Sequence, residues 1–137
     1  MGVAMLVPVT ALYASLLTLI MIDLAFRVGS RRGRLQISMG DGGDPQIVVD
    51  NRRHLNFVEH VPMAVILMGI VELNGAPKLW LYIIGAVVVI ARILHPIGLN
   101  AQGMGHPFRT IGAMLTMLST VTLVGIALWQ VLSRGLP

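Results

Sequence analysis

The stretch VVDNRRHLNFVEHVP, residues 48–62, carries the side chains best suited to binding chemistry, and an uninterrupted apolar run, MAVILMGIV, follows it. Successive residues of a helix are about 100° apart, which places Arg52, Asn56 and Glu59 within one narrow arc. This stretch therefore predicts a helix that carries a cation, an amide and a carboxylate on a single face.

Other polar residues extend this group. Arg53 and His60 flank the shared face, at about 100° and 80° from its first arginine. Further along the chain, Arg92 and His95 are about 60° apart on a second apolar helix and therefore share a face as well. Arg109 directly precedes the last apolar run. The seven candidates for a binding site are Arg52, Asn56, Glu59, His60, Arg92, His95 and Arg109.

Ionised side chains are costly in hydrocarbon, so they normally face a bundle interior or a cavity and pair with one another. We therefore expect Glu59 to pair with Arg52 or Arg92. One interpretation is a static ion-pair network that joins two helices. The other is an anion-binding site, because four arginines of this group face only two acidic residues, Asp50 and Glu59. Guanidinium groups bind carboxylates with two parallel hydrogen bonds and favour the ionised form of a thiol.

The composition places this site in a membrane protein. Of the 137 residues, 55% are hydrophobic and only 12% are charged, and the mean hydropathy is +0.81. The net charge of +4 is concentrated in arginines of the first half, which does not indicate nucleic-acid binding. The chain has no cysteine, so thiol chemistry would need a thiol brought by a ligand. No pair of histidines has a metal-ligand spacing backed by a carboxylate, so we predict no metal.

The apolar runs predict a single all-α domain, a bundle of four transmembrane helices. Residues 3–22 contain no ionisable group and match the roughly 20 residues that cross a bilayer. A cleaved signal peptide is the alternative, but a basic front region is missing. Arginines, glycines and a proline over 27–46 predict a polar loop, with Asp44 capping the next helix. The four helices are expected at about 3–26, 45–73, 78–99 and 109–133.

Four spans place both termini on one side of the membrane. The predicted first loop contains four arginines, whereas the opposite turn at 74–78 contains only Lys78. The positive-inside rule makes the arginine loop cytoplasmic and both termini periplasmic. The candidate site would then lie toward the cytoplasmic face.

Three motifs resemble the MAPEG superfamily, the membrane-associated proteins of eicosanoid and glutathione metabolism. RRHLNFVEHVP resembles the signature of its second helix, ARILHPIGL the arginine-bearing third helix, and FRTIGAMLT the start of the fourth. The resemblance covers the whole chain and is closest to small bacterial members, which implies a bacterial inner membrane.

This resemblance implies a homotrimer that binds glutathione as co-substrate between neighbouring subunits. Arg52, Asn56 and Glu59 match positions that hold the tripeptide, and Glu59 would meet its amino group. His60 stands where the family often has tyrosine. The remaining matches are Arg92, His95 and Arg109, of which Arg109 would steady the thiolate.

The sequence also departs from the enzymatic members. Val48 and Val49 stand where these often carry a Glu-Arg pair, and Leu99 replaces a tyrosine. The resemblance implies a glutathione-dependent transferase or peroxidase-like enzyme whose lipophilic substrate arrives from the membrane lipids. The alternative is a non-catalytic protein that binds a lipid or another anion, or that serves as a small subunit of a larger membrane complex. A four-helix transporter is a third interpretation, and the arginines around Glu59 disfavour it.

Overall fold

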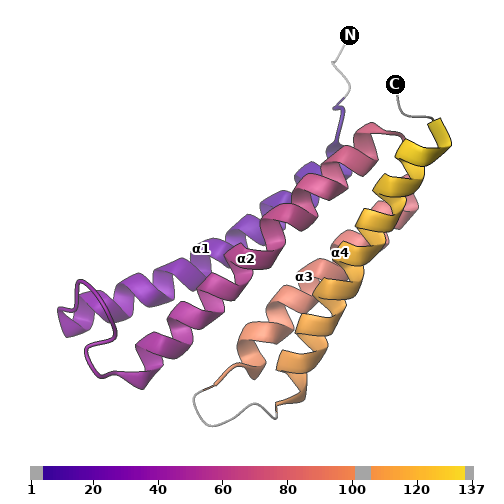
Figure 1. Cartoon of the computed structure of the whole chain (residues 1–137). Helices are drawn as coiled ribbons and strands as arrows, with labels where there is room; N and C mark the ends of the chain where they lie inside the picture. Colours follow the sequence, from indigo (N-terminus) through magenta and orange to yellow (C-terminus); the bar gives the residue numbers. More distant parts are fainter. Residues whose placement is uncertain (1–4, 101–105, 135–137) are drawn as a thin grey trace.

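The computed structural model describes residues 5–100 and 106–134, which form four α-helices (Figure 1). The helices are α1 (Pro8–Leu35), α2 (Pro45–Leu73), α3 (Lys78–Gly98) and α4 (Pro107–Arg134). Each is long and apolar enough to cross a membrane. The predicted all-α membrane fold with four transmembrane helices is therefore confirmed.

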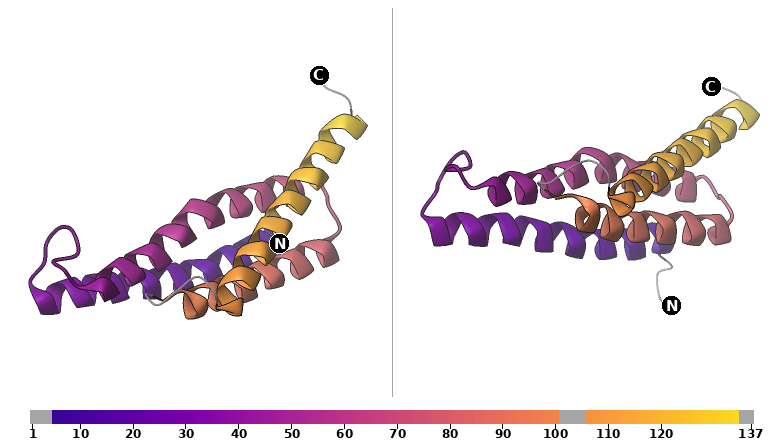
Figure 2. Two further views of the ribbon diagram at one scale, coloured as in Figure 1. Left: turned by 60° about the horizontal axis from the view of Figure 1, so that its bottom comes forward. Right: turned by 90° about the horizontal axis from the view of Figure 1, so that it is seen from below.

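The helices form two antiparallel hairpins, α1 with α2 and α3 with α4 (Figure 1). In addition, α1 packs against α3 and α2 packs against α4, whereas α2 packs only slightly against α3. The start of α1 and the end of α4 lie at the same end of the bundle, where the hairpins approach each other. At the opposite end the two hairpins diverge, as the further views in Figure 2 also show.

The first helix is longer than the sequence predicts, and the polar loop is correspondingly shorter. The expected bounds were 3–26, but α1 continues to Leu35, so the arginines that were assigned to a loop lie on its last turns. Two glycines cost a helix only about 1 kcal/mol each. Asp23 and Arg27 form an i,i+4 ion pair at 2.8 Å, and basic residues near a helix C-terminus are favourable. Its last helical residue is Leu35, and the C-cap residue Gln36 has a left-handed φ of 54°.

A buried carboxylate from α2 caps the beginning of α1. The residue before α1, Val7, provides no side-chain cap. Instead the carboxylate of Glu72 accepts hydrogen bonds from the backbone N–H groups of Val9, at 3.0 Å, and Thr10, at 2.7 Å. The sequence analysis did not identify this contact, which joins the end of α2 to the start of α1.

Glycines permit the closest contacts between helices. A Cβ atom on Gly85 of α3 would lie 2.2 Å from the ring of Tyr13 on α1, and the Tyr13 hydroxyl donates to the carbonyl of Tyr82 at 2.8 Å. A Cβ atom on Gly112 of α4 would lie 2.7 Å from the Ala91 carbonyl of α3. Both glycines are therefore positions at which a larger residue would separate two helices.

Candidate functional site

All seven candidate residues line one of two adjoining clefts between α2 and the α3–α4 hairpin. The first cleft has a volume of about 430 Å³, and its lining includes Arg52, Asn56, His95 and Arg109. The second has a volume of about 200 Å³, and its lining includes Asn56, Glu59, His60 and Arg92. Asn56 belongs to both clefts, so they are neighbours along α2.

Arg92 is buried where the two clefts meet. Its guanidinium donates to the side-chain oxygen of Asn56 at 3.0 Å and to the carbonyl of Gly112 at 3.2 Å. Its Nε is also buried and has no hydrogen-bond partner within the described residues. Arg92 is thus held by an amide and a carbonyl. The pairing of Arg92 with Glu59, one of the two that the sequence analysis expected, does not form.

Glu59 pairs with Arg52, the other expected partner, but the pair is not buried. The closest oxygen and nitrogen are 3.9 Å apart, and the side chains are 49% and 54% exposed. The expectation of a buried ion pair is therefore wrong for the single chain, because both side chains lie at the exposed edge of the clefts. Both charges remain accessible to a ligand or to another subunit.

Arg109 and His95 both line the first cleft, at the adjacent ends of α4 and α3. Within residues 5–100 and 106–134, the Arg109 guanidinium has no hydrogen-bond or ion-pair partner. A Cβ atom on Gly98 would lie 2.2 Å from the Arg109 backbone nitrogen. Glycine therefore brings the start of α4 against the end of α3 and leaves the guanidinium beside the cleft.

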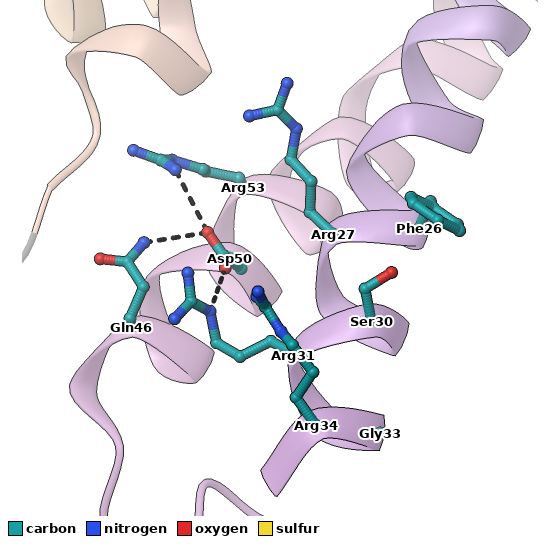
Figure 3. A pocket seen from close by; sticks show the side chains of 9 residues that line it. All are labelled: Phe26, Arg27, Ser30, Arg31, Gly33, Arg34, Gln46, Asp50 and Arg53. Carbon is teal, nitrogen blue, oxygen red and sulfur yellow. Dashed lines mark hydrogen bonds and ion pairs between the residues drawn. The ribbon is translucent and has the colours of Figure 1, made fainter.

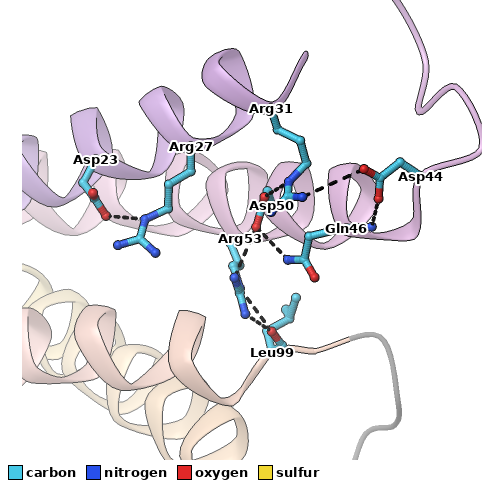
Figure 4. A network of polar contacts seen from close by, with 8 residues as sticks. All are labelled: Asp23, Arg27, Arg31, Asp44, Gln46, Asp50, Arg53 and Leu99. Carbon is cyan, nitrogen blue, oxygen red and sulfur yellow. Dashed lines mark hydrogen bonds and ion pairs between the residues drawn. The ribbon is translucent and has the colours of Figure 1, made fainter. Parts of the chain in front are cut away.

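A second polar cluster, built around Asp50 and Arg53, supports the rim of the first cleft. The buried Asp50 carboxylate accepts from Arg31 at 2.9 Å, from Gln46 at 3.0 Å and from Arg53 at 3.2 Å (Figure 3). Arg53 also donates to the Leu99 carbonyl through two nitrogens, at 3.1 and 2.6 Å (Figure 4). Asp50 and Arg53 thereby tie the first hairpin to the end of α3. The sequence feature that could have predicted this cluster is Asp50, an acidic residue that lies close to arginines in the sequence.

The comparisons with known proteins agree with this architecture. The family model described as the MAPEG family matches residues 10–129. The chain belongs to the MAPEG family. It is also similar to inner membrane protein YecN of Escherichia coli K12, with 32% identity over 121 residues that cover 88% of this chain and 91% of the relative. YecN of Escherichia coli O6:H1 matches to the same extent. No solved structure matches the chain significantly.

In this MAPEG protein the three apolar departures from the family pattern lie together. Val48, Val49 and Leu99 all line the first cleft, beside Arg52 and Arg109. The cleft thus has an apolar wall and two guanidinium groups, a combination that suits a ligand with both apolar and anionic parts. Across the part of the chain that the structure describes, no three histidine, aspartate or glutamate side chains gather as a metal site.

Proposed function

We propose that this MAPEG protein binds glutathione in the two adjoining clefts and uses its thiolate to attack lipophilic electrophiles in a bacterial inner membrane. The observation that carries the proposal is the convergence of all seven candidate residues, from three helices, on clefts that share Asn56. Family membership and the inner-membrane relative support the location and the chemistry.

The charges of the clefts are complementary to glutathione. Arg52, Arg92 and Arg109 line them against one carboxylate, Glu59. Glutathione carries two carboxylates, one ammonium group, two amides and a thiol. In the proposed complex Arg52 binds a carboxylate, Glu59 binds the ammonium group and Asn56 bonds an amide, because charge-assisted hydrogen bonds are the strongest available.

Arg109 would act on the thiol. A guanidinium within about 4–6 Å favours the ionised form and lowers the pKa of the neighbouring group by about one to three. A free thiol with a pKa near 8.5 is only about 3% ionised at pH 7, and this shift raises the ionised fraction to between about 24% and 97%. The thiolate sulfur then forms a bond to the electrophilic carbon while the leaving group departs with the bonding electrons. With a peroxide substrate, a second glutathione would complete the reduction to alcohol, water and glutathione disulfide.

The exposed polar face of α2 supports assembly as a homotrimer. Arg52, Glu59 and His60 are exposed in the single chain, although α2 is a membrane-spanning helix. Lipid is a poor environment for these groups, whereas another subunit or a ligand between subunits would cover them. The arginine-rich end of α1 would be cytoplasmic and the termini periplasmic.

A non-catalytic binding protein is the second candidate, and the apolar wall of the first cleft favours it. Val48, Val49 and Leu99 provide no side-chain polar group to a bound tripeptide. A lipid-derived anion, or a partner subunit in a larger membrane complex, would tolerate such a wall.

The deciding experiment compares Arg109→Ala with Arg134→Ala, a matched control at the other end of α4. Thiolate absorbance near roughly 240 nm is recorded on adding glutathione to the purified protein, together with the rate of conjugation to an aryl halide. We expect Arg109→Ala to lower the rate at pH 7 by about tenfold with glutathione affinity within a few-fold. The loss should shrink above pH 9, where the free thiol ionises unaided.

Glutathione binding with no thiolate signal and with no conjugation that depends on Arg109 would contradict the transferase and favour the non-catalytic binding protein.

A further inference from the structure

A second pair of connected cavities lies on the other side of Arg53, against α1. The first cavity, which we call the polar cleft, has a volume of about 750 Å³ and lies between the end of α1 and the beginning of α2. The second, the apolar groove, has a volume of about 470 Å³ and runs between α1 and α3. Arg27 and Arg53 line both, so the two cavities meet at these side chains.

The polar cleft carries an excess of positive charge. Its lining includes four arginines, Arg27, Arg31, Arg34 and Arg53, and a single carboxylate, Asp50. Asp50 is already bonded by two of them and by Gln46. Arg31 of α1 reaches the Asp50 carboxylate (Figure 3), whereas Arg27 is paired with Asp23 at 2.8 Å (Figure 4). The guanidinium of Arg34 has no hydrogen bond or ion pair in the described part of the chain, so the cluster retains donors for an anion.

The apolar groove begins where the polar cleft ends. Its apolar lining consists of Leu19, Ile20 and Leu24 of α1 and Ile93, Pro96 and Ile97 of α3, and its charged lining consists of Asp23, Arg27, Arg53 and Arg92. Leu19, Ile93 and Ile97 are more than 45% exposed. A surface of this kind in a membrane-spanning bundle is suited to a hydrocarbon chain.

The position of the two cavities matches the layers of a bilayer. With its 28 residues, α1 is roughly 40 Å long at about 1.5 Å per residue, whereas the hydrocarbon layer is about 30 Å thick. The end of α1 that carries the arginines therefore reaches the level of the headgroups. The groove, one to two turns earlier on α1, lies at the level of the acyl chains.

We propose that these cavities form a binding site for an anionic phospholipid, which shares only Arg92 of its lining residues with the glutathione clefts. The phosphate binds the arginines of the polar cleft, and one acyl chain lies in the apolar groove beside Ile93. Basic clusters at the membrane surface recognise anionic lipids by this combination of charge and depth. The proposal holds for either leaflet, because the layers are the same on both sides.

The test measures lipid retention by the purified full-length chain with native mass spectrometry. Detergent-solubilised protein is mixed with dioleoyl phosphatidylglycerol or with dioleoyl phosphatidylcholine, which has the same acyl chains and no net charge. We expect the anionic lipid to be retained at least about fivefold more. Each arginine at a membrane surface contributes roughly a fivefold change in affinity, so Arg27→Gln with Arg34→Gln should weaken retention about 25-fold. Lys78→Gln with Arg134→Gln, which removes two positive charges at the opposite end of the bundle, should have no effect.

A second pair of variants tests the groove without changing charge. Ile93→Trp fills the groove and should lower retention of phosphatidylglycerol by at least fivefold, whereas Ile90→Trp, an equally exposed position of α3 outside the groove, should not. Inorganic phosphate alone should raise the melting temperature less than the lipid does.

Equal retention of the two lipids, equal effects of Ile93→Trp and Ile90→Trp, or equal stabilisation by inorganic phosphate would each overturn the lipid site. A change in oligomer mass with Ile93→Trp would assign the groove to contact with a second copy of the chain.

Discussion

Removing the carboxylate of Glu72 is expected to destabilise the bundle more than removing any acid of the candidate site. Glu72 accepts two backbone hydrogen bonds at the start of α1. The loss of an exposed helix cap costs about 0.5–2 kcal/mol, because water replaces the missing acceptor. Here Val9 is 0% exposed and Thr10 is 8% exposed, so water cannot replace it.

Each buried N–H group left without a partner costs about 1–3 kcal/mol. Glu72→Ala leaves two N–H groups unpaired, which corresponds to a loss of about 2–6 kcal/mol in unfolding free energy. The variant no longer has to bury a carboxylate, so we expect a loss in the lower half of this range. Glu72→Gln retains one acceptor oxygen and should cost about 1–3 kcal/mol. The matched variant Glu59→Gln removes a half-exposed carboxylate 3.9 Å from its partner, a type of pair worth about 0–1 kcal/mol.

The assay is reversible unfolding in mixed micelles with increasing dodecyl sulfate, which gives the free energy of unfolding of each variant. Amide hydrogen exchange adds a local measurement, because Val9 and Thr10 should lose protection in Glu72→Gln and keep it in Glu59→Gln. Equal losses of stability for the two glutamine variants, with unchanged exchange at α1, would refute the assignment of Glu72 as the helix cap.

Two further predictions concern packing and orientation. Gly112→Ala places a methyl group 2.8 Å from the backbone nitrogen of His95. This variant should lose about 1–3 kcal/mol of unfolding free energy in the same assay. The control Gly125→Ala, which has open space around it, should be neutral or should gain up to about 1 kcal/mol. In intact cells, a cysteine introduced at Gly33 should be protected from an impermeant maleimide while one introduced at Lys78 is labelled, and the reverse pattern would contradict the proposed orientation.

Helical periodicity predicted which side chains share a face but not which face is covered. The 100° repeat correctly groups Arg52, Asn56 and Glu59 along α2, and all three line the two clefts. It does not indicate that Asp50, two residues before Arg52, is buried. Burial depends on where α1 packs, and the position of α1 is a tertiary property.

The contacts at the helix ends were unpredictable for a related reason. The sequence shows that Val7 offers no side-chain cap to α1, but the acceptor that replaces it, Glu72, is 63 residues from Val9. Likewise, the arginine-rich composition after Phe26 is typical of a loop. These arginines are helical because they form ion pairs with acidic residues of α1 and α2. Local composition therefore identified the four spans, whereas long-range polar contacts determine where α1 begins and ends.

Two consecutive arginines of α2 serve different cavities because they lie about 100° apart on the helix. Arg52 lines the first cleft with Arg109, whereas Arg53 lines the polar cleft and the apolar groove. Arg53 also donates to the carbonyl of Leu99, which lines the first cleft. Arg53 thus lies between the proposed glutathione site and the proposed lipid site, together with Arg92, which lines both the apolar groove and the second cleft. Substitutions on the Arg52 side and on the Arg27 side of Arg53 should therefore separate the two activities.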